Sequence, residues 1–585
     1  MQRVLRLLLL GVVVSARFAQ AAPVRRFEGR AATAGTFDLA RDGVSRMERL
    51  SFDAALPGFL EEIPMESEVS IAGWPLSPGR RAEVSLTRHD VYAADARIFR
   101  VDGGTLTELP KSRLHFFWGT VAGDEATRVV VILDPDRKTF HGLAETEAGL
   151  QELRAETGDE GARHVLGEAQ SFLSPEQQAE RRWSCGEDQV PYDPAVDAAP
   201  RQTLAGVAPL AITSLHTAVI AVDTDNELMA FYGDNTTNAT NYIASLFASM
   251  SLMYERDLLV RLVQGTTFLR VTTTPDPYAL GTNGGAGIAN LNEFTNYWAT
   301  NNGGITRALA MMLSGKQSSG FSASGIAWLD GLCNSSSTGY SYSQVFKPGN
   351  LTGDTYVVGH EVGHNFGSPH THCYNPPIDT CYIQSGPTCW PGPGTSCPAA
   401  ATYNGVPSVT GTLMSYCHVS GIAGCSAKNV FHPTSVALLQ PKIVAAVGTC
   451  IFPFTVAAAG PIKFYSVPPC RVVDTRNAAG SLGGPALAAN GLRVFPIVGS
   501  CGVPASAKSI SGNITVTQVA AAGDLKIYPA DLGPPSSTSI TFAPGLTRAN
   551  SAQLRLATNS AGTLAVQNES ASTIHFILDV NGYFQ

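Results

Sequence analysis

Alternating apolar and polar positions predict β-structure in the first 200 residues. Runs such as Ala82–Leu86 and Thr127–Leu133 predict strands, and Gly123-Asp124 between two such runs predicts a hairpin. The charged stretch Ser174–Arg182 predicts a helix instead, because Ser174 fits an N-cap and the following proline fits the first turn. Charged residues are dense here and sparse afterwards, which predicts a domain boundary near residue 203.

Apolar runs of strand and helix length alternate between about residues 204 and 452. Such alternation is typical of an α/β (α+β) domain with a mixed, mainly parallel sheet. The Gly-bounded run Gly325–Cys333 is expected to be an edge strand. The other predicted strands are 217–222, 258–263 and 306–313, and the predicted helices are 238–253 and 288–300.

Many short strands separated by turns rich in Gly, Pro, Ala and Ser follow from about residue 453 to 585. This pattern predicts an all-β, sandwich-like domain. The predicted strands are 514–519, 525–528, 553–556 and 575–580. Pro469–Arg476 and Asp579–Phe584 resemble a recurrent accessory domain of secreted bacterial proteins. Attachment to a surface or polysaccharide and a passive stabilising role both remain open for it.

The first 22 residues have the pattern of a secretory signal peptide. Arg3 and Arg6 precede the apolar run Leu7–Val14, and Ala19–Ala22 offers a small-residue cleavage site. No later stretch approaches the roughly 20 apolar residues that a membrane-spanning helix needs. We therefore expect a secreted protein without a membrane span.

Composition limits the classes of partner. Hydrophobic residues make up 44% of the 585 positions, which indicates globular material and not disorder. The net charge is −8 and no basic run is present, so nucleic acid is not an expected partner.

The strongest chemical signal is the run His360-Glu361-Val362-Gly363-His364-Asn365-Phe366-Gly367-Ser368-Pro369-His370. On a helix, His360 and His364 lie one turn apart on one face, and Glu361 points near the same spot. Gly367 lets the backbone turn and Pro369 bars further helix, so His370 can fold back as a third ligand. Three neutral imidazoles leave a tetrahedral Zn²⁺ one position for water.

The bounds of the helix and the choice of the third ligand are further expectations for this run. The helix is expected to begin at Asp354, as an N-cap, and to end at Gly367. His372 is a competing third ligand, but the turn at Gly367 favours His370. A chance occurrence of the short HExxH pattern on an ordinary helix is the alternative to a metal site.

The extended pattern HExxHxxGxxH resembles the metzincin clan of zinc endopeptidases, and the residues after it resemble the secreted bacterial members of the adamalysin (reprolysin) branch. The clan has a methionine-containing turn beneath the metal, and Met414 in Gly411–His418 matches it. Tyr416 stands where animal adamalysins usually have proline. In the astacin and serralysin branches such a tyrosine ligates zinc or stabilises the transition state; a packed tyrosine is the alternative.

The resemblance implies a reaction and a substrate. Glu361 would act as general base on the zinc-activated water, and substrate proteins or peptides would lie antiparallel to the predicted edge strand. The expected activity is that of a metalloendopeptidase. The competing hypothesis is a secreted adhesin or matrix-binding protein with a vestigial protease domain, which the intact motif disfavours. Peptide specificity is left open by the sequence.

Eleven cysteines separate into two even sets and one remainder. Eight fall in the middle region and two in the last, consistent with disulfides in an exported protein, while Cys185 is left over. A thiolate upstream of a zinc site can occupy its open position, and Cys185-Gly186 resembles the cysteine switch of metzincin propeptides. Residues 23–203 would then be the propeptide of a latent zymogen. An incidental thiol is the alternative.

Three further expectations concern processing, pairing and ions. Arg181-Arg182 is a candidate cleavage site, but removal of Cys185 needs a cut nearer Arg201–Val207.

The metzincin resemblance favours a Cys333–Cys417 disulfide, and the four cysteines between 373 and 397 are expected to form disulfides and not a second zinc site. The carboxylates within Asp223–Glu227 either cap the next helix in a solvated turn, which is favoured, or bind Ca²⁺.

Overall fold

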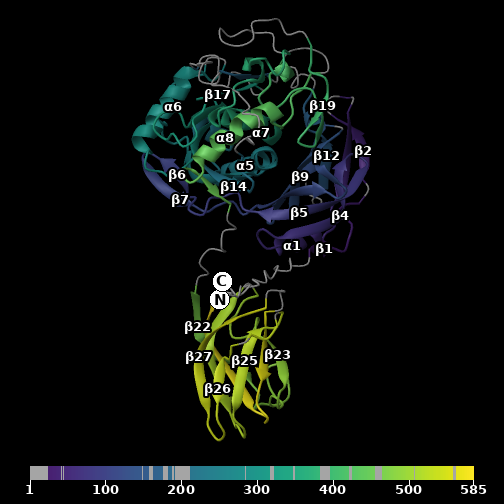
Figure 1. The fold of residues 1–585 in the computed structure, drawn as a ribbon, viewed down its shortest axis with the longest axis vertical. Coiled ribbons are helices and arrows are strands. Elements are labelled where there is room, and N and C mark those ends of the chain that lie inside the picture. Colours follow the sequence, from purple (N-terminus) through teal and green to yellow (C-terminus); the bar gives the residue numbers. More distant parts are fainter. Residues whose placement is uncertain are drawn as a thin grey trace, which may run out of the picture. The chain divides into compact units, whose positions relative to one another are not determined.

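The protein forms two compact units in the computed structural model, residues up to Val456 and residues from Ala457 (Figure 1). The expected signal peptide lies outside the described residues, as does most of the helix expected at 174–182. The structure describes residues 24–585 except 34, 41–42, 44, 148, 157–162, 175–181, 187–189, 191–210, 283–284, 317–321, 347–349, 382–395, 420–424, 455–463, 506, 532, 536 and 558–561.

The N-terminal part of the first unit is a ten-stranded sheet, accompanied by the short helices α1 (Leu56–Glu61) and η1 (Ala169–Phe172). The strands expected at 82–86 and 127–133 are present. The hairpin expected at Gly123-Asp124 joins strands His115–Val121 and Asp124–Asp134, which are neighbours in this sheet. In spatial order the strands are β1 (Arg25–Phe27), β4 (Glu68–Ser77), β5 (Arg80–His89), β8 (His115–Val121), β9 (Asp124–Asp134), β10 (Thr139–Thr146), β11 (Gly149–Ala155), β12 (Arg163–Glu168), β3 (Arg46–Ser51) and β2 (Thr36–Leu39).

A nine-stranded mixed sheet organises the rest of this unit. Most neighbours run parallel, as expected; β17 and β18, β6 and β7, and β14 and β21 run antiparallel. The order is β13 (Arg182–Cys185), β17 (Ser322–Ala327), β18 (Tyr340–Gln344), β16 (Leu309–Ser314), β14 (His216–Thr224), β15 (Val260–Arg270), β6 (Ile98–Asp102) and β7 (Thr105–Leu109), with β21 (Ile451–Pro453) beside β14.

Helices cover both faces of the nine-stranded sheet because its central strands are apolar on both sides. In β14, Ile220 and Val222 share a core with α5 and α7, whereas Ala221 shares another with α6. The expected helices at 238–253 and 288–300 are confirmed as α5 and α6. The elements are α4 (Asn226–Phe231), α5 (Thr236–Leu258), α6 (Ile288–Asn301), α7 (Leu351–Asn365), α8 (Pro433–Ala446), η3 (Thr371–Cys373), η4 (Cys417–Val419) and the hairpin β19 (Ala401–Tyr403)–β20 (Val406–Val409).

Two expected boundaries are wrong. Helix α7 starts earlier than Asp354, because Asn350 is its N-cap and accepts from the backbone N–H of Gly353 at 3.3 Å. The Asp354 carboxylate instead accepts from Phe346 N and Tyr242 Oη. The strand expected over 325–333 ends at Ala327, after which the backbone turns.

Strands from the first 203 residues lie in the nine-stranded sheet, which the sequence did not indicate. The β6–β7 hairpin extends the sheet beyond β15, and β13 extends it beyond β17 at the opposite edge. The β-rich N-terminal region therefore contributes to both sheets of the unit.

The disulfides of the first unit differ from the favoured pairing. The expected Cys333–Cys417 bond is wrong: Cys333 lies at the end of α8, beside Cys450, and Cys417 lies beside Cys381. Cys185 is buried and belongs to none of the described disulfides, consistent with its being the cysteine left over. The described pairs are Cys333–Cys450, Cys381–Cys417, Cys397–Cys425 and Cys470–Cys501.

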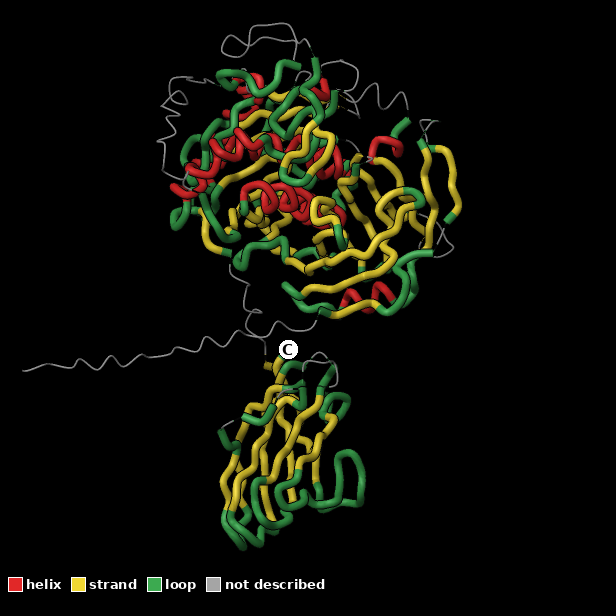
Figure 2. Tube along the Cα trace, turned by 45° about the vertical axis from the view of Figure 1, so that its right-hand side comes forward, coloured by secondary structure: helices red, strands yellow, loops and turns green. Residues whose placement is uncertain are grey.

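The second unit consists of two antiparallel four-stranded sheets that share one apolar core, and Figure 2 shows strands and loops among its described residues. Among the residues that the structure describes, no helix in either unit is long and apolar enough to cross a bilayer. One sheet has the order β22 (Phe464–Asp474), β29 (His575–Phe584), β24 (Ser509–Thr517), β27 (Arg548–Arg555), and the other β23 (Leu492–Pro496), β28 (Thr563–Asn568), β25 (Gly523–Pro529), β26 (Ile540–Phe542).

Candidate metal centre

Helix α7 carries the first half of the candidate site into the interior. His360, Glu361 and His364 are all fully buried on it. After the helix, Gly367 adopts a φ of +104°, a conformation that a side chain would resist. This turn brings His370, also fully buried, back toward the helix, as expected.

The three imidazoles point their Nε2 atoms at one spot. His360 Nε2 lies 3.0 Å from His364 Nε2 and 3.1 Å from His370 Nε2. Together with Cys185 Sγ, one ligand atom from each residue falls within 4.8 Å of all the others. Four atoms about 2.0–2.3 Å from a tetrahedral zinc are about 3.3–3.7 Å apart, so this set is close to the size of such a shell.

Hydrogen bonds on the far side of two rings fix their tautomers. His360 Nδ1 lies 2.7 Å from Leu413 O, and His364 Nδ1 lies 2.7 Å from Ser368 O. A carbonyl oxygen only accepts, so each Nδ1 carries the hydrogen and each Nε2 presents a lone pair. Two lone pairs 3.0 Å apart repel one another, whereas a cation between them would attract both. The donor set therefore fits a metal ion.

Burial favours the neutral form of the rings. It lowers the pKa of His370 to about 3, and it lowers the pKa of His360 further below the ordinary value, with His364 and His370 adding to the effect. Neutral imidazole is the form that binds a metal.

Glu361 lies at the same spot. Its Oε2 is 3.5 Å from Cys185 Sγ, on the side of the cluster that faces β17. Gly325 of β17 lies so close that a β-carbon there would overlap the Glu361 carboxylate. A glycine in the strand is thus what leaves room for the carboxylate.

Cys185 reaches the cluster at the end of β13. That strand pairs in parallel with β17, and Gly186 N donates to Gly325 O at 2.7 Å. The sulfur lies 3.5 Å from His364 Nε2. Tyr416 holds the cysteine backbone from the other side: its hydroxyl accepts from Cys185 N at 3.0 Å and donates to Cys185 O at 2.9 Å.

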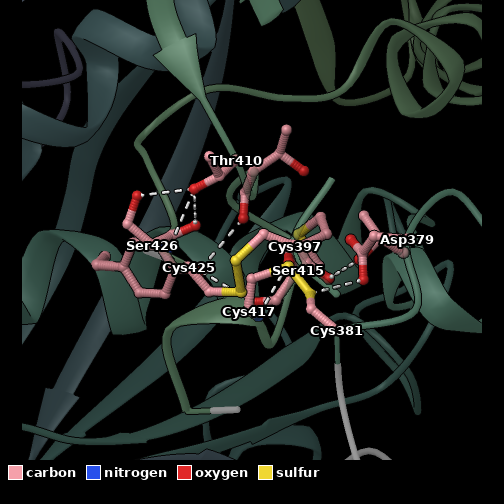
Figure 3. The surroundings of a disulfide bond; sticks show 12 residues. Asp379, Cys381, Cys397, Thr410, Ser415, Cys417, Cys425 and Ser426 are labelled. Carbon is pink, nitrogen blue, oxygen red and sulfur yellow. Dashed lines mark hydrogen bonds between the residues drawn. A yellow bond between two sulfur atoms is a disulfide. The ribbon is translucent and has the colours of Figure 1, made fainter. Parts of the chain in front are cut away.

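Met414 lies beneath the histidines in a segment that two disulfides hold. A β-carbon at Gly363 would be 2.6 Å from Met414 Sδ, so the helix passes directly over the sulfur. Thr371 N donates to Met414 O at 3.0 Å, which links the turn to the stretch carrying His370. Figure 3 shows the surrounding Cys381–Cys417 and Cys397–Cys425 bonds, with Asp379 beside Cys381.

Other candidate ligands do not join the three Nε2 atoms. His372 stacks on His370, with ring centroids 5.2 Å apart. Two further groups of described residues could be close enough to hold an ion, but each depends on disulfide-bonded cysteines, Cys373 in one and Cys381 with Cys417 in the other.

Two of the three carboxylates considered for Ca²⁺, those of Asp223 and Asp225, are occupied by hydrogen-bond donors. Asp223 accepts from Arg270, Tyr278 and Trp298. Asp225 caps α4 by accepting from Leu228 N at 2.8 Å. The capping interpretation holds, but both residues are fully buried and not in a solvated turn.

Residues 214–422 match the sequence model of the family described as Metallo-peptidase family M12 (Reprolysin_5). This stretch of the chain is similar to a metallo-peptidase. The match spans helix α7 with His360 and His364, the following turn with His370, and the Met414 segment, and it supports a metalloprotease. Residues 214–422 are called the metallo-peptidase-like region below.

Likeness to whole proteins is weak. No curated protein matches the chain. A chaperone–substrate complex shares 12% identity at a TM-score of 0.24 over 40% of this chain, and the chain spans 36% of that protein. The coat protein of tobacco streak virus shares 10% identity at a TM-score of 0.13, over 22% of this chain and 90% of that one. Scores this low carry no argument about fold or function.

Four contacts of the site were not foreseen from the sequence. They are the hydrogen bonds of His360 to Leu413 O and of His364 to Ser368 O, the close approach of Gly325 to Glu361, and the bonding of the Tyr416 hydroxyl to the Cys185 backbone. Only the glycine left a signal, as an interruption of an apolar run; the carbonyls depend on tertiary folding.

Gly363→Ala is expected to destabilise the first unit by about 1–3 kcal/mol, because the new methyl group would overlap Met414 Sδ in a packed core. Thermal unfolding measures the effect. Gly58→Ala in α1 is the matched control, since nothing lies within 4 Å of a β-carbon there. Equal unfolding temperatures for Gly363→Ala and the wild type would show that the helix does not rest on Met414.

Proposed function

We propose that the protein is a secreted zinc-dependent endopeptidase that is made as a latent zymogen. The observation that carries this proposal is the convergence of three buried imidazole Nε2 atoms beside a carboxylate. The family match supports the metallopeptidase class. Disulfides support an exported protein, because they persist in oxidising compartments.

His360, His364 and His370 would hold the zinc ion. A zinc ion in such a site supplies Lewis acidity, which lowers the pKa of water toward about 7 and polarises a peptide carbonyl. The carbonyls of Leu413 and Ser368 keep two of the imidazoles oriented and their Nε2 atoms unprotonated. Zinc fits this donor set because all three nitrogen ligands are buried and burial favours the neutral form of His360 and His370.

Glu361 acts as the general base. Its carboxylate takes the proton of the attacking water and then gives it to the nitrogen of the leaving amine. Glu361 follows the ligand His360 in the sequence, so its carboxylate lies beside the reacting water without being needed as a ligand. Gly325 preserves the space that the carboxylate needs.

Tyr416 stabilises the oxyanion of the tetrahedral intermediate by donating from its hydroxyl. In the latent chain the same hydroxyl donates to Cys185 O at 2.9 Å, so it already faces an oxygen at the position of a bound peptide. Departure of Cys185 frees the hydroxyl for substrate.

A substrate peptide takes the place of β13 on β17. The β17 edge binds extended chains through main-chain hydrogen bonds, as its pairing with β13 illustrates. Substrate is expected to run antiparallel to this edge, whereas β13 runs parallel to it. The reversed direction lets β13 occupy the cleft without presenting a peptide bond in the orientation that is cleaved.

Cys185 would maintain latency, because its thiolate would be a fourth ligand to a metal ion held by the three histidines. Its sulfur lies among the three Nε2 atoms and Glu361, where the attacking water would otherwise stand. The vestigial-adhesin alternative is not favoured, because the candidate ligands and base come together in one buried cluster. The role of residues 453–585 is not part of this proposal.

Glu361→Gln is expected to lower kcat/KM on a quenched peptide by about 10²–10⁴-fold while leaving one zinc per chain, because only the base is lost. Peptide hydrolysis and metal content measure the two effects in the processed protein. Hydrolysis at the wild-type rate by the zinc-loaded variant would refute the assigned base.

Cys185→Ala is expected to make the uncut chain active, since water can then enter the fourth position. Hydrolysis by uncut protein is compared with hydrolysis after processing. Cys185→Ser is the graded control, because a hydroxyl is a weaker zinc ligand than a thiolate. An uncut Cys185→Ala chain that stays inactive, while the processed form is active, would mean that the thiol does not impose latency.

Tyr416→Phe is expected to change a measurable property of both the processed protein and the uncut chain. In processed protein it lowers kcat by roughly 10–10³-fold through loss of an oxyanion donor. In the uncut chain it speeds alkylation of Cys185 by iodoacetamide, because two hydrogen bonds to that backbone are lost. Tyr403→Phe serves as control. An unchanged kcat together with an unchanged alkylation rate would show that Tyr416 only packs against its neighbours.

A further inference from the structure

The region before Cys185 is built into the same body as the metallo-peptidase-like region. Residues up to Val456 form one compact unit, which includes the ten-stranded sheet and the β6–β7 hairpin. Cys185 is the first cysteine in the sequence, so no disulfide can join residues 24–173 to the rest. Whatever holds the two parts together after a chain break is noncovalent.

Strand β6 completes the sheet beside β15. The two run parallel from Ile98–Thr267 to Val101–Arg270. The segment before β6 continues the ladder, since Gln264 N donates to Val91 O at 2.7 Å and Ala93 N donates to Gln264 O at 2.9 Å. Loss of the N-terminal region would leave an unpaired edge along β15, which proteins normally avoid.

The ten-stranded sheet buries both of its faces, and one of them lies on α5. In β9, Val129, Val131 and Leu133 pack with the N-terminal region's own core, whereas Val130 and Ile132 belong to the core that contains α5. Helix α5 is therefore covered by strands on two sides, as Figure 1 shows near the labels β14 and β9. Exposing this apolar surface to water would be unfavourable.

A buried ion pair crosses the same junction. Arg261 of β15 donates to Glu66 at 3.0 Å and to Glu255 at 2.6 Å, and its guanidinium lies over the Trp118 ring at 5.1 Å. Glu66 also contacts His89 at 2.9 Å. Removal of the N-terminal region would leave Arg261, only 2% exposed here, without Glu66 and the Trp118 ring, although Glu255 and the Phe454 ring, 4.1 Å from the guanidinium, would remain.

The N-terminal region also contacts the helix that carries the candidate site. The buried carboxylate of Glu152, in β11, accepts from Thr352 Oγ1 in the first turn of α7 at 2.9 Å. Although burial opposes ionisation, hydrogen bonds from His141 and Arg154 lower the pKa of Glu152 to about 2. A negative charge at a helix N-terminus stabilises the helix.

We propose that residues 24–173 remain bound to the metallo-peptidase-like region after the chain is cut beyond Cys185, so that the working enzyme is a noncovalent two-chain particle. Opening the site then requires only the segment around Cys185 to leave, while the rest stays as a structural partner. This inference uses the proposed function solely for the existence of a cut. It adds a structural role after cleavage to residues 24–173 of the expected propeptide, residues 23–203.

The test uses the full chain with the recognition site of a specific protease inserted between Gln202 and Thr203. A Glu361→Gln background prevents self-digestion and makes the result independent of catalysis. After cutting, gel filtration at micromolar concentration in physiological salt is expected to give one peak containing both fragments. Separate peaks, with the C-terminal fragment still folded by circular dichroism, would overturn the proposal.

A charge change tests the interface itself. Glu66→Arg would place a second cation against Arg261 and is expected to weaken association of the cut fragments at least about tenfold. Glu62→Arg is the matched control, because Glu62 pairs with Arg25 on the exposed side of the same region. Equal association for both variants would contradict the assigned contact; if Glu66→Arg does not fold before cutting, the result with unaltered Glu66 decides.

Discussion

The structure depends on one constraint: three buried imidazole rings point their Nε2 atoms at one another. His360 Nε2 lies 3.0 Å from His364 Nε2 and 3.1 Å from His370 Nε2, and the lone pairs that His360 and His364 present repel at this distance. Packing alone would not maintain such an arrangement, because burial disfavours the protonation of His360 that would relieve the repulsion. A shared cation removes the repulsion, so the proposed zinc ion is what makes this core favourable.

The surrounding elements serve that constraint in successive layers. The segment around Met414 supplies a carbonyl to His360 and receives a backbone hydrogen bond from the His370 stretch. Disulfides at Cys381–Cys417 and Cys397–Cys425 hold this segment in place. On the opposite side, β13 and Tyr416 close the site over Cys185. One arrangement thus orients the candidate ligands and holds Cys185 beside them.

Local patterns predicted the parts of the site that lie close together in sequence. The turn at Gly367 followed from glycine's freedom at positive φ, and the strand and helix types followed from apolar periodicity. Contacts between distant segments were not encoded in any local pattern. The Cys333–Cys450 pairing and the place of β6 beside β15 depend on tertiary packing, and the start of α7 depends on whether Asn350 or Asp354 is free to cap it.

X-ray absorption at the zinc edge of the uncut protein tests the central claim most directly. The proposed site predicts one zinc per chain with three nitrogen ligands at about 2.0–2.1 Å and one sulfur at about 2.3 Å, and loss of the sulfur shell once the segment carrying Cys185 is removed. A protein that binds no zinc would contradict the metal centre itself. Bound zinc with only nitrogen and oxygen neighbours in the uncut chain would contradict the role of Cys185.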